Sequence, residues 1–271
     1  MTRKAKSLED ALKNLIPEEL LGYVPRAFDT IGDIIVLKIP EELEGHEREI
    51  GRAFCEAYPY IKTVLNQTGP VEGEFRTRPL ELLYGKDKRA TLYKEHGCVF
   101  KVDLDKAYFS PRLATERGRI RDMVEEGEKI LNMFAGIGTF SIVIARYKKV
   151  EIYSVDKNPN AYNLMIENIG MNKLKGEVKP VLGDARDFVR EGYFDRVLMP
   201  LPERAEEFLD VAAINARHGG RIHYHIFCRD FGEVEENLSR LKVRYEIEEK
   251  RVVRSYAPGV YHVVFDMVIM K

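Results

Sequence analysis

Short apolar runs separated by turns fill the first part of the chain. Ser7 precedes an amphipathic run that predicts a helix over residues 8–16, and Pro17 ends it. A second helix is predicted over residues 43–57. The predicted strands cover residues 31–40, 63–67, 80–85, 91–97 and 98–104, with a hairpin turn at His96 and Gly97. This order predicts a small α+β domain over residues 1–117.

From residue 118 onward, apolar strands alternate with helices, which predicts a mostly parallel sheet with both faces covered. Two β-rich runs within residues 251–270 flank a turn at residues 256–259, so the sheet is expected to end in an antiparallel hairpin. Residues 118–271 therefore read as a Rossmann-like α/β domain. Its predicted strands cover residues 129–134, 150–156, 178–184, 194–200 and 221–227, and a helix is predicted over 205–216.

A nucleotide site is predicted where the first strand of this domain meets its helix. Gly136 and Gly138 lie in that turn, where missing side chains let backbone N–H groups approach a ligand. Asp156 ends the next strand, where a carboxylate can accept hydrogen bonds from both ribose hydroxyls. Asp184 ends the third strand, close to an expected adenine edge. The alternative is that the glycines only make a tight turn and Asp156 only caps a helix.

The turn favours S-adenosylmethionine (SAM) over NAD as the nucleotide. It reads A-G-I-G-T-F-S, lacks the third glycine of the dinucleotide fingerprint, and places Phe140 where a pyrophosphate would need access. SAM has no phosphate and tolerates both features. The closing hairpin and the acid at the third strand tip also resemble the sheet of class I SAM-dependent methyltransferases.

Two further places are candidates for the reacting groups. The fourth strand ends at Pro200, where proline offers only a carbonyl, and a loop stiffened by prolines is the simpler interpretation. Just before the α/β domain, Glu116 stands among Arg112, Arg117 and Arg119. A carboxylate beside arginines can act as a positioned base next to groups that stabilise negative charge. A surface ion-pair network is the alternative.

Charge is balanced overall and uneven along the chain. The 271 residues hold 43 Lys+Arg and 44 Asp+Glu, with 45% hydrophobic residues, which indicates a folded protein and excludes a uniformly basic coat protein. Residues 76–121, however, hold 12 basic and 6 acidic side chains, a balance of +6. This basic segment is either a solvated surface or a face that contacts phosphates.

Cysteine, histidine and hydropathy patterns bear on the expected compartment and on disulfide and metal binding. The three cysteines are far apart and lack a Cys-x-x-Cys pair, so we predict no disulfide framework and no structural zinc. No membrane helix or signal peptide is recognisable, which favours the cytoplasm. His223, His225 and His262 lie on predicted strands, where packed or hydrogen-bonded histidines are commoner than ligands, so we predict no metal.

Several motifs, in their order and spacing, resemble one family from about Arg76 to the C-terminus. The family comprises the archaeal and eukaryotic tRNA methyltransferases that modify N1 of guanosine 37, beside the anticodon, with their relatives in wyosine synthesis. The resemblance implies a class I SAM-dependent methyltransferase fold, SAM as cofactor and the tRNA anticodon stem-loop as partner. We further expect a cytoplasmic monomer. The motifs are YFSPRLATERGRI, NMFAGIGTFSI, VDKNPNAYNLMIENIGMNKL, GDARDF and MPLP.

The resemblance also implies roles for individual residues. Glu116 would be the general base for N1, Arg112 would stabilise charge on the purine, and Pro200 would border the reacting groups. Tyr108 and Arg76 would contact the target nucleoside or its backbone. The residues expected at SAM are Arg117, Phe134, Ala135, Gly136, Gly138, Asp156, Lys157, Asp184 and Ala185.

Two departures from the family pattern bear on the substrate. Pro200-Leu201-Pro202 replaces the usual Asn-Leu-Pro, as in the archaeal subgroup that also methylates C7 of 4-demethylwyosine. Full-length members generally carry a further small N-terminal domain, and this chain starts near the second domain. The alternatives are a SAM-dependent aminocarboxypropyltransferase of wybutosine synthesis and a non-catalytic RNA-binding scaffold.

Overall fold

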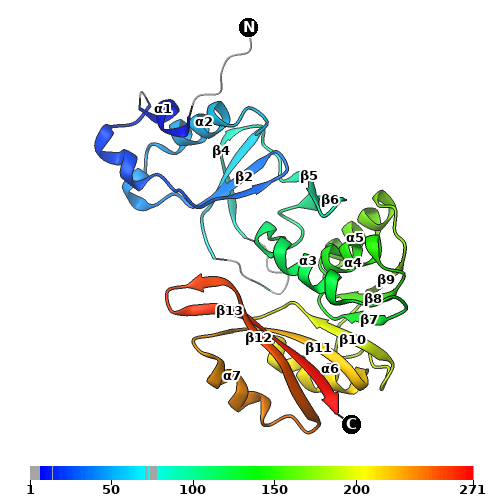
Figure 1. Cartoon of the computed structure of the whole chain (residues 1–271). Coiled ribbons are helices and arrows are strands. Elements are labelled where there is room, and N and C mark those ends of the chain that lie inside the picture. The colour runs from blue at the N-terminus through cyan, green and yellow to red at the C-terminus, as the bar shows by residue number, and fades with distance from the viewer. Residues whose placement is uncertain (1–6, 14, 71–72, 74–77, 271) are drawn as a thin grey trace. The chain divides into compact units, whose positions relative to one another are not determined.

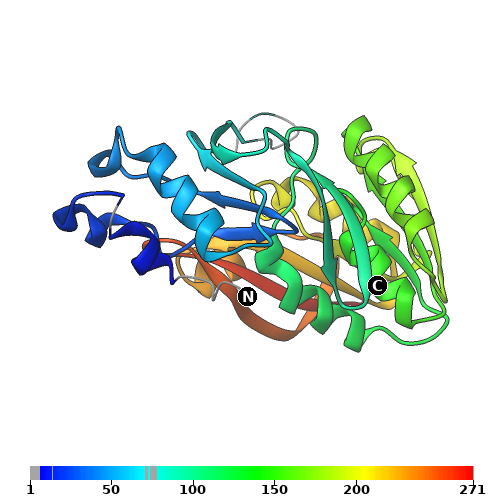
Figure 2. The same cartoon turned by 90° about the horizontal axis from the view of Figure 1, so that it is seen from above.

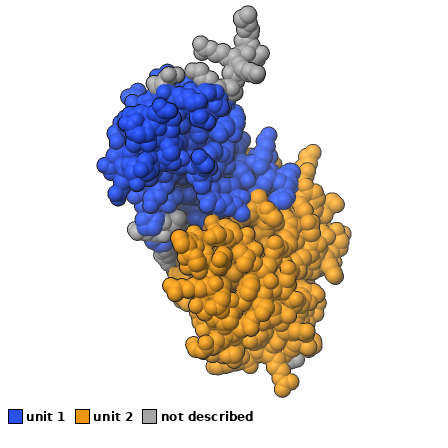
Figure 3. All heavy atoms as spheres, turned by 60° about the vertical axis from the view of Figure 1, so that its left-hand side comes forward, with its two compact units in different colours: residues 1–112 blue, residues 113–271 orange. Residues whose placement is uncertain are grey.

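The computed structural model describes residues 7–13, 15–70, 73 and 78–270 (Figure 1). The chain divides into two compact units, Met1–Arg112 and Leu113–Lys271, coloured separately in Figure 3. Each unit has its own apolar core. The domain boundary predicted after Arg117 falls inside the helix Ala114–Met123, which belongs to the second unit.

The first unit contains a four-stranded sheet of order β1-β2-β3-β4, in which only β2 and β3 are parallel. Helix α2 packs on β3 and β4, and a separate hairpin, β5–β6, follows. The strands are β1 (Asp29–Ile31), β2 (Ile34–Leu37), β3 (Thr63–Gln67), β4 (Leu80–Gly85), β5 (Ala90–Glu95) and β6 (Cys98–Asp103). The α-helices are α1 (Leu8–Leu12) and α2 (Glu47–Ala57), and the 3-10 turns are Glu18–Tyr23, Glu41–Leu43 and Pro111–Leu113.

Most elements predicted for this unit are confirmed, with three corrections. The helix predicted over 8–16 ends at Leu12, and the helix predicted over 43–57 begins at Glu47. The single strand predicted over 31–40 is wrong, because β1 and β2 form a hairpin in which Ile31 pairs with Ile34. Gly32 makes this turn possible with a φ of 58°, and it sits against the backbone of Leu92. The predicted cap is confirmed, since the Ser7 hydroxyl accepts the Asp10 N–H at 3.0 Å.

The second unit is built on a seven-stranded sheet of order β12-β13-β11-β10-β7-β8-β9. All neighbouring strands are parallel except β13, which is antiparallel to both of its neighbours. The strands are β7 (Lys129–Asn132), β8 (Glu151–Asp156), β9 (Glu177–Leu182), β10 (Phe194–Met199), β11 (Ala216–Cys228), β12 (Arg244–Ala257) and β13 (Val260–Met270). The helices are α3 (Ala114–Met123), α4 (Thr139–Tyr147), α5 (Pro159–Met171), α6 (Leu209–Asn215) and α7 (Phe231–Leu238), with a 3-10 turn at Ala205–Phe208.

Alternating side chains on the strands bury both faces of this sheet. Ile130 and Leu198 join a core with α3 and α4, while Leu131 and Val197 join the opposite core with α6 and α7. Figures 1 and 2 show α3, α4 and α5 along one face and α6 along the other. The predicted parallel sheet with a closing hairpin is confirmed.

The differences in this unit are local. The residues predicted as one helix over 205–216 form a 3-10 turn followed by α6. Helix α7 was not predicted, although Asp230 caps it by accepting the Gly232 N–H at 2.7 Å. Among the described residues, no helix is long and apolar enough to cross a membrane.

Candidate active site

The turn between β7 and α4 has a backbone that glycine favours. Gly136 has a φ of 55° and Gly138, the N-cap of α4, a φ of 87°. A Cβ atom at Gly138 would lie 2.9 Å from Cγ of Met165. Gly138 is therefore needed both for its φ and for close packing against α5, and a glycine turn at the N-terminus of a helix is what the sequence predicts for a nucleotide site.

Asp156 closes this turn from the neighbouring strand. Its Oδ2 accepts the Gly136 N–H at 2.6 Å and its Oδ1 accepts the Asn158 N–H at 2.9 Å. Its backbone carbonyl accepts the Gly183 N–H at 3.0 Å, which ties β8 to the loop after β9. Burial raises the pKa of Asp156, while the two N–H groups oppose that change. A carboxylate in these surroundings is a strong acceptor for ribose hydroxyls.

Asp184 lies at the third strand tip in a local ion-pair cluster. Arg186 donates to its two carboxylate oxygens at 2.9 and 2.6 Å, and Lys157 Nζ lies 3.6 Å away. The hydrogen bonds from Arg186 hold the pKa of Asp184 well below its usual range, against a smaller opposing effect of burial. Ala185, next in the chain, is buried in the core. The carboxylate is therefore an anion that already has partners.

A buried cluster of polar side chains joins the elements on either side of the turn, and the sequence analysis did not predict it. Asn132 Nδ2 donates to Ser141 Oγ at 3.0 Å, and the hydroxyls of Ser154 and Ser141 lie 2.7 Å apart. These contacts join β7, β8 and α4. Polar residues within otherwise apolar runs were the available signal. Directly before Gly136 in the chain, Ala135 is buried and the Phe134 ring packs edge-on against Phe208.

Glu116 lies in a second polar cluster, and its side chain is only 2% exposed. Arg119 donates to Glu116 Oε1 from Nη2 at 2.7 Å and to Oε2 from Nε at 3.0 Å. His225 Nε2 lies 3.7 Å from Oε1, and Arg251 Nη1 lies 3.9 Å from Oε2. Burial lowers the pKa of His225 to about 3, so this histidine is neutral at pH 7.

Phe140 connects the Glu116 cluster with the glycine turn. It belongs to the first turn of α4, its ring centre is 6.2 Å from that of His225, and the guanidinium carbon of Arg117 is 5.9 Å from the Phe140 centre. Arg117, like Glu116, is buried on α3. The structure thus brings Glu116 and Arg117 close to the helix that begins at Gly138. Sequence separation alone did not show this proximity.

Pro200 follows β10 directly and is half-buried. Strand β10 lies between β7 and β11, at the point where the strand order reverses. Carboxyl ends of strands beside such a reversal form the usual ligand crevice of open parallel sheets. Pro200 therefore stands at the edge that also carries the glycine turn.

The other predicted contact residues belong to the first unit. Arg112 Nε donates to Asp29 Oδ1 at 2.6 Å, and Arg78 Nη1 lies 3.7 Å from Asp29 Oδ2. Arg78 also donates to the Phe109 carbonyl at 2.8 Å. Tyr108 is half-buried. Arg76 lies outside the described residues.

Many basic side chains of residues 76–121 are already paired with acidic side chains in the folded structure. Seven of the segment's described members form ion pairs with acids, and Asp29 and Asp33 contribute from outside the segment. These members are Arg78, Lys88, Arg89, Lys106, Arg112, Arg119 and Arg121.

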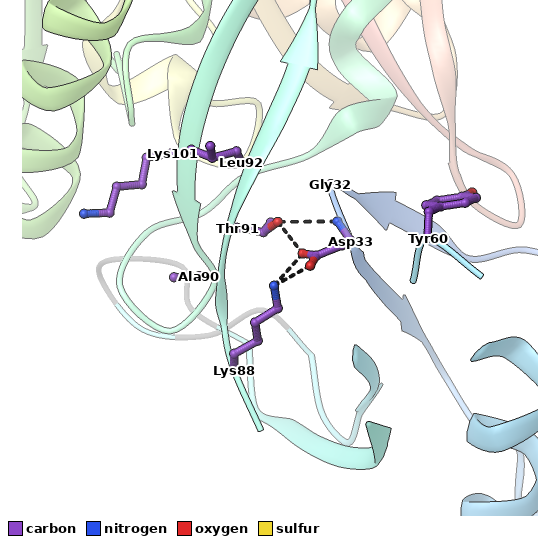
Figure 4. Close-up of a pocket in the computed structure, with 8 residues that line it drawn as sticks. All are labelled: Gly32, Asp33, Tyr60, Lys88, Ala90, Thr91, Leu92 and Lys101. Carbon is purple, nitrogen blue, oxygen red and sulfur yellow. Dashed lines mark hydrogen bonds and ion pairs between the residues drawn. The ribbon is translucent and has the colours of Figure 1, made fainter. Parts of the chain in front are cut away.

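A cavity of about 620 Å³ in the first unit lies between the β1–β2 turn and β5 (Figure 4). Lys88 Nζ is 2.6 Å from both oxygens of Asp33, and the Thr91 hydroxyl is 2.6 Å from one of them. Burial alone would raise the pKa of Asp33, but these hydrogen bonds hold it below its usual value. Asp33, Lys88 and Thr91 partner one another in this cavity, so the sheet edge of the second unit is the better candidate.

The three histidines are hydrogen-bonded partners in the core. His223 Nδ1 lies 2.5 Å from Asp266, and His225 Nδ1 lies 3.1 Å from His262 Nε2. Within the part of the chain that the structure describes, no three His, Cys, Asp or Glu side chains are grouped as metal ligands.

Comparison with known proteins identifies the family. A model of the TRM5/TYW2 methyltransferase domain matches residues 91–253, and a model of the TYW2 N-terminal domain matches residues 8–88. The chain belongs to the TRM5/TYW2 methyltransferase family. The predicted resemblance, enzyme class and methyltransferase fold are thereby confirmed.

Relatives in this family carry different activities in their names. A tRNA (guanine(37)-N(1))-methyltransferase Trm5b of Pyrococcus abyssi is 42% identical over 259 residues, 93% of this chain and 77% of the relative. The tRNA 4-demethylwyosine(37)-methyltransferase Taw21 of Saccharolobus solfataricus is 35% identical, covering 89% and 93%. A tRNA(Phe) (4-demethylwyosine(37)-C(7)) aminocarboxypropyltransferase of Pyrococcus horikoshii is 34% identical, covering 97% and 96%.

Solved structures in the family superpose along most of the chain. A complex of aTrm5 with tRNALeu has a TM-score of 0.89 at 37% identity, covering 98% of this chain and 79% of that one. Pyrococcus horikoshii TYW2 in complex with MeSAdo has a TM-score of 0.82 at 32% identity, covering 97% and 98%. Methanocaldococcus jannaschii TYW2 in complex with AdoMet has a TM-score of 0.69 at 31% identity, covering 90% and 100%.

Proposed function

We propose that this chain transfers the methyl group of SAM to N1 of guanosine 37 in tRNA. The observation that carries the proposal is the hydrogen bond from the Gly136 N–H to Asp156 at the carboxyl edge of the sheet. Glu116 lies near helix α4, which begins just after this glycine turn. Family membership and the AdoMet and MeSAdo complexes of relatives support the cofactor. The tRNA complex of aTrm5 supports the partner.

The residues at the sheet edge fit SAM. Gly136 and Gly138 bring no side chain into the turn, and Asp156 would accept hydrogen bonds from the ribose of SAM. Phe134, Ala135, Lys157, Asp184, Ala185 and Arg117 stay predictions as further contacts of SAM. When bound, SAM supplies an electrophilic methyl group.

Glu116 would serve the reaction as a proton acceptor. Guanine N1 carries a proton near neutral pH and is a poor nucleophile until that proton leaves. Glu116 would take the proton at a carboxylate oxygen, the nitrogen lone pair would form the new N–C bond, and the S–C bond electrons would remain on sulfur. Arg112, Tyr108 and Arg76 stay predictions as contacts of the nucleoside.

The direct test incubates the protein with SAM and two tRNAs, one with unmodified guanosine 37 and one with 4-demethylwyosine, followed by nucleoside mass analysis. A methyl gain on guanosine is expected. Glu116→Gln should lower kcat by about 10²–10⁴ with SAM affinity retained. No SAM binding in a calorimetric titration would favour the RNA-binding scaffold instead, and a gain of the aminocarboxypropyl mass would favour that transferase.

A second substrate, C7 of 4-demethylwyosine, is favoured by Pro200. Proline has no side-chain amide to contact a purine, and Taw21 is among the relatives. If the missing amide admits the larger base, Pro200→Asn should abolish methylation of 4-demethylwyosine and spare that of guanosine. Equal loss of both activities would contradict this reading. A monomer in the cytoplasm remains our prediction, and sedimentation of the purified protein tests the first part.

A further inference from the structure

The Glu116 carboxylate shares its arginine with a second buried acid. Arg119 reaches Glu116 with Nε and Nη2, and the same guanidinium reaches Asp266 Oδ2 with Nη1 at 2.5 Å and Oδ1 with Nη2 at 3.2 Å. The side chains of Glu116, Arg119 and Asp266 are 2%, 13% and 1% exposed. One cation from α3 thus bridges two carboxylates, one on α3 and one on β13.

Asp266 has a second buried partner, the neutral ring of His223. His223 Nδ1 lies 2.5 Å from Asp266 Oδ1, and His223 Nε2 lies 2.6 Å from Arg196 Nη1. Arginine can only donate, so Nε2 accepts and the proton of His223 is on Nδ1, pointing at Asp266. Burial lowers the pKa of His223, which agrees with a neutral ring. Arg196 is itself paired with Glu128 at 2.7 and 2.8 Å.

Arg119 is a buried cation that contacts both Glu116 and Asp266. His225 on β11 is neutral, and Arg251 on β12 is 3.9 Å from Glu116 with its side chain 34% exposed. Glu249, also on β12, reaches Arg119 at 3.7 Å from a half-exposed position. Burial alone would raise the pKa of Asp266, but His223 and Arg119 hold it well below its usual range. Asp266 therefore stays ionised in the folded protein and remains an anionic partner of Arg119.

We propose that Asp266 is a positioning residue for the reaction, which secures Arg119 so that Glu116 can accept a proton. When Glu116 becomes neutral, Arg119 still has an anionic partner and no buried cation is left unpaired. Without the Asp266 charge, protonation of Glu116 would strand Arg119, so Glu116 would be a weaker base. The role of this network in methyl transfer rests on the proposed function.

The test compares two substitutions with opposite expected effects. In Asp266→Asn, an isosteric change, Glu116 should take its proton at a pH lower by about one unit than in the wild type. In Arg119→Gln, two acids face each other without their cation, so protonation should occur at a pH higher by about one unit or more. Arg119→Lys should return it part of the way, because lysine restores the charge and cannot bridge both acids.

The primary readout needs no turnover. Protein labelled with ¹³C at the glutamate carboxyl carbon is titrated by NMR, and the Glu116 signal is assigned by its loss in Glu116→Gln. Glu249→Gln, which removes only the exposed contact of Arg119, is the matched control and should move the midpoint little. Thermal unfolding and SAM titration verify that each variant is folded. Unchanged midpoints, or shifts of both variants in the same direction, would overturn the proposal.

The pH dependence of methyl transfer then separates this inference from the proposed function. Asp266→Asn should lower kcat about threefold to tenfold and move the acidic limb of the rate profile to lower pH, with KM for SAM unchanged. A wild type without N1 methylation would refute the proposed function and leave the NMR result standing. An active wild type with an unchanged profile in Asp266→Asn would refute the positioning role alone.

Discussion

The glycine turn and the Glu116 cluster lie in the same unit and are built in different ways. The turn is formed by two glycines with positive φ and by Asp156, whose carboxylate accepts hydrogen bonds from the Gly136 and Asn158 N–H groups. At Glu116, side chains from α3, β11, β12 and β13 satisfy one another. The turn is thus held mainly by backbone groups and one acid, whereas the Glu116 cluster is held by side chains that pair with one another.

This contrast explains why one region could be predicted and the other only in part. The spacing from Gly138 to Asp156 spans one helix and one strand, so local periodicity places both residues at the same sheet edge. Arg119 and Asp266 are 147 residues apart, and only the antiparallel insertion of β13 beside β11 brings them together. Local patterns carry no information on that contact.

The largest expected effect is the loss of stability when Arg196, the hydrogen-bond partner of His223, is replaced. Arg196→Met removes the buried partner of Glu128 and the donor to His223, which should lower the free energy of unfolding by about 3–5 kcal/mol. Urea denaturation measures the change. The control is Arg204→Met, whose pair with Glu207 is half-exposed, and it should stay within about 0.5 kcal/mol. Equal losses in the two variants would contradict the difference between buried and exposed pairs.

The next effect addresses the turn. Asp156→Ala removes the acceptor that we propose for the ribose hydroxyls and should weaken SAM binding by about 2–4 kcal/mol, roughly 30-fold to 900-fold in Kd. Asp156→Asn keeps one acceptor oxygen and should lose less. Isothermal titration at a pH where each variant is folded gives the affinities. If the Asn and Ala variants bind SAM like the wild type, Asp156 is only a helix-capping residue.

A pH titration of stability probes the neutral histidines of the cluster. Unfolded His225 binds a proton near pH 6.5, but the folded residue does so only near pH 3, so the unfolded state binds more protons between these values. The free energy of unfolding should therefore fall as the pH falls from 6.5 towards 3, by up to about 1.4 kcal/mol per pH unit from this residue. Denaturant unfolding of His225→Asn should show a shallower slope, and exposed His218→Asn should keep the wild-type slope.

The smallest effect tests the requirement for glycine in the turn. Gly138→Ala forces a φ of 87° on a residue with a Cβ and should destabilise the fold by about 1–2 kcal/mol. In contrast, Gly170→Ala near the end of α5 meets open space and should stabilise by about 0.4–1 kcal/mol. Thermal unfolding of both variants measures the difference, and the same sign for both would contradict the argument from φ.

Much of the fold followed from the sequence, and the exceptions have physical causes. Strands such as β8 and β10 were recognisable because each is a short apolar run bounded by turns or helices. The strand predicted over 31–40 was divided because a single glycine permits a two-residue hairpin inside an apolar run. Ser141 and Asn132 were missed because a polar residue in an apolar stretch does not reveal its partner.

The pairing of Arg78 and Arg112 with Asp29 has a consequence for association with a polyanion. These arginines already hold an internal counterion, so fewer mobile cations and anions are exchanged when phosphate approaches them. Any RNA affinity of the first unit should then depend less steeply on salt than a tally of its lysines and arginines implies. Asp29 would act as a built-in competitor that RNA must displace before those arginines become available.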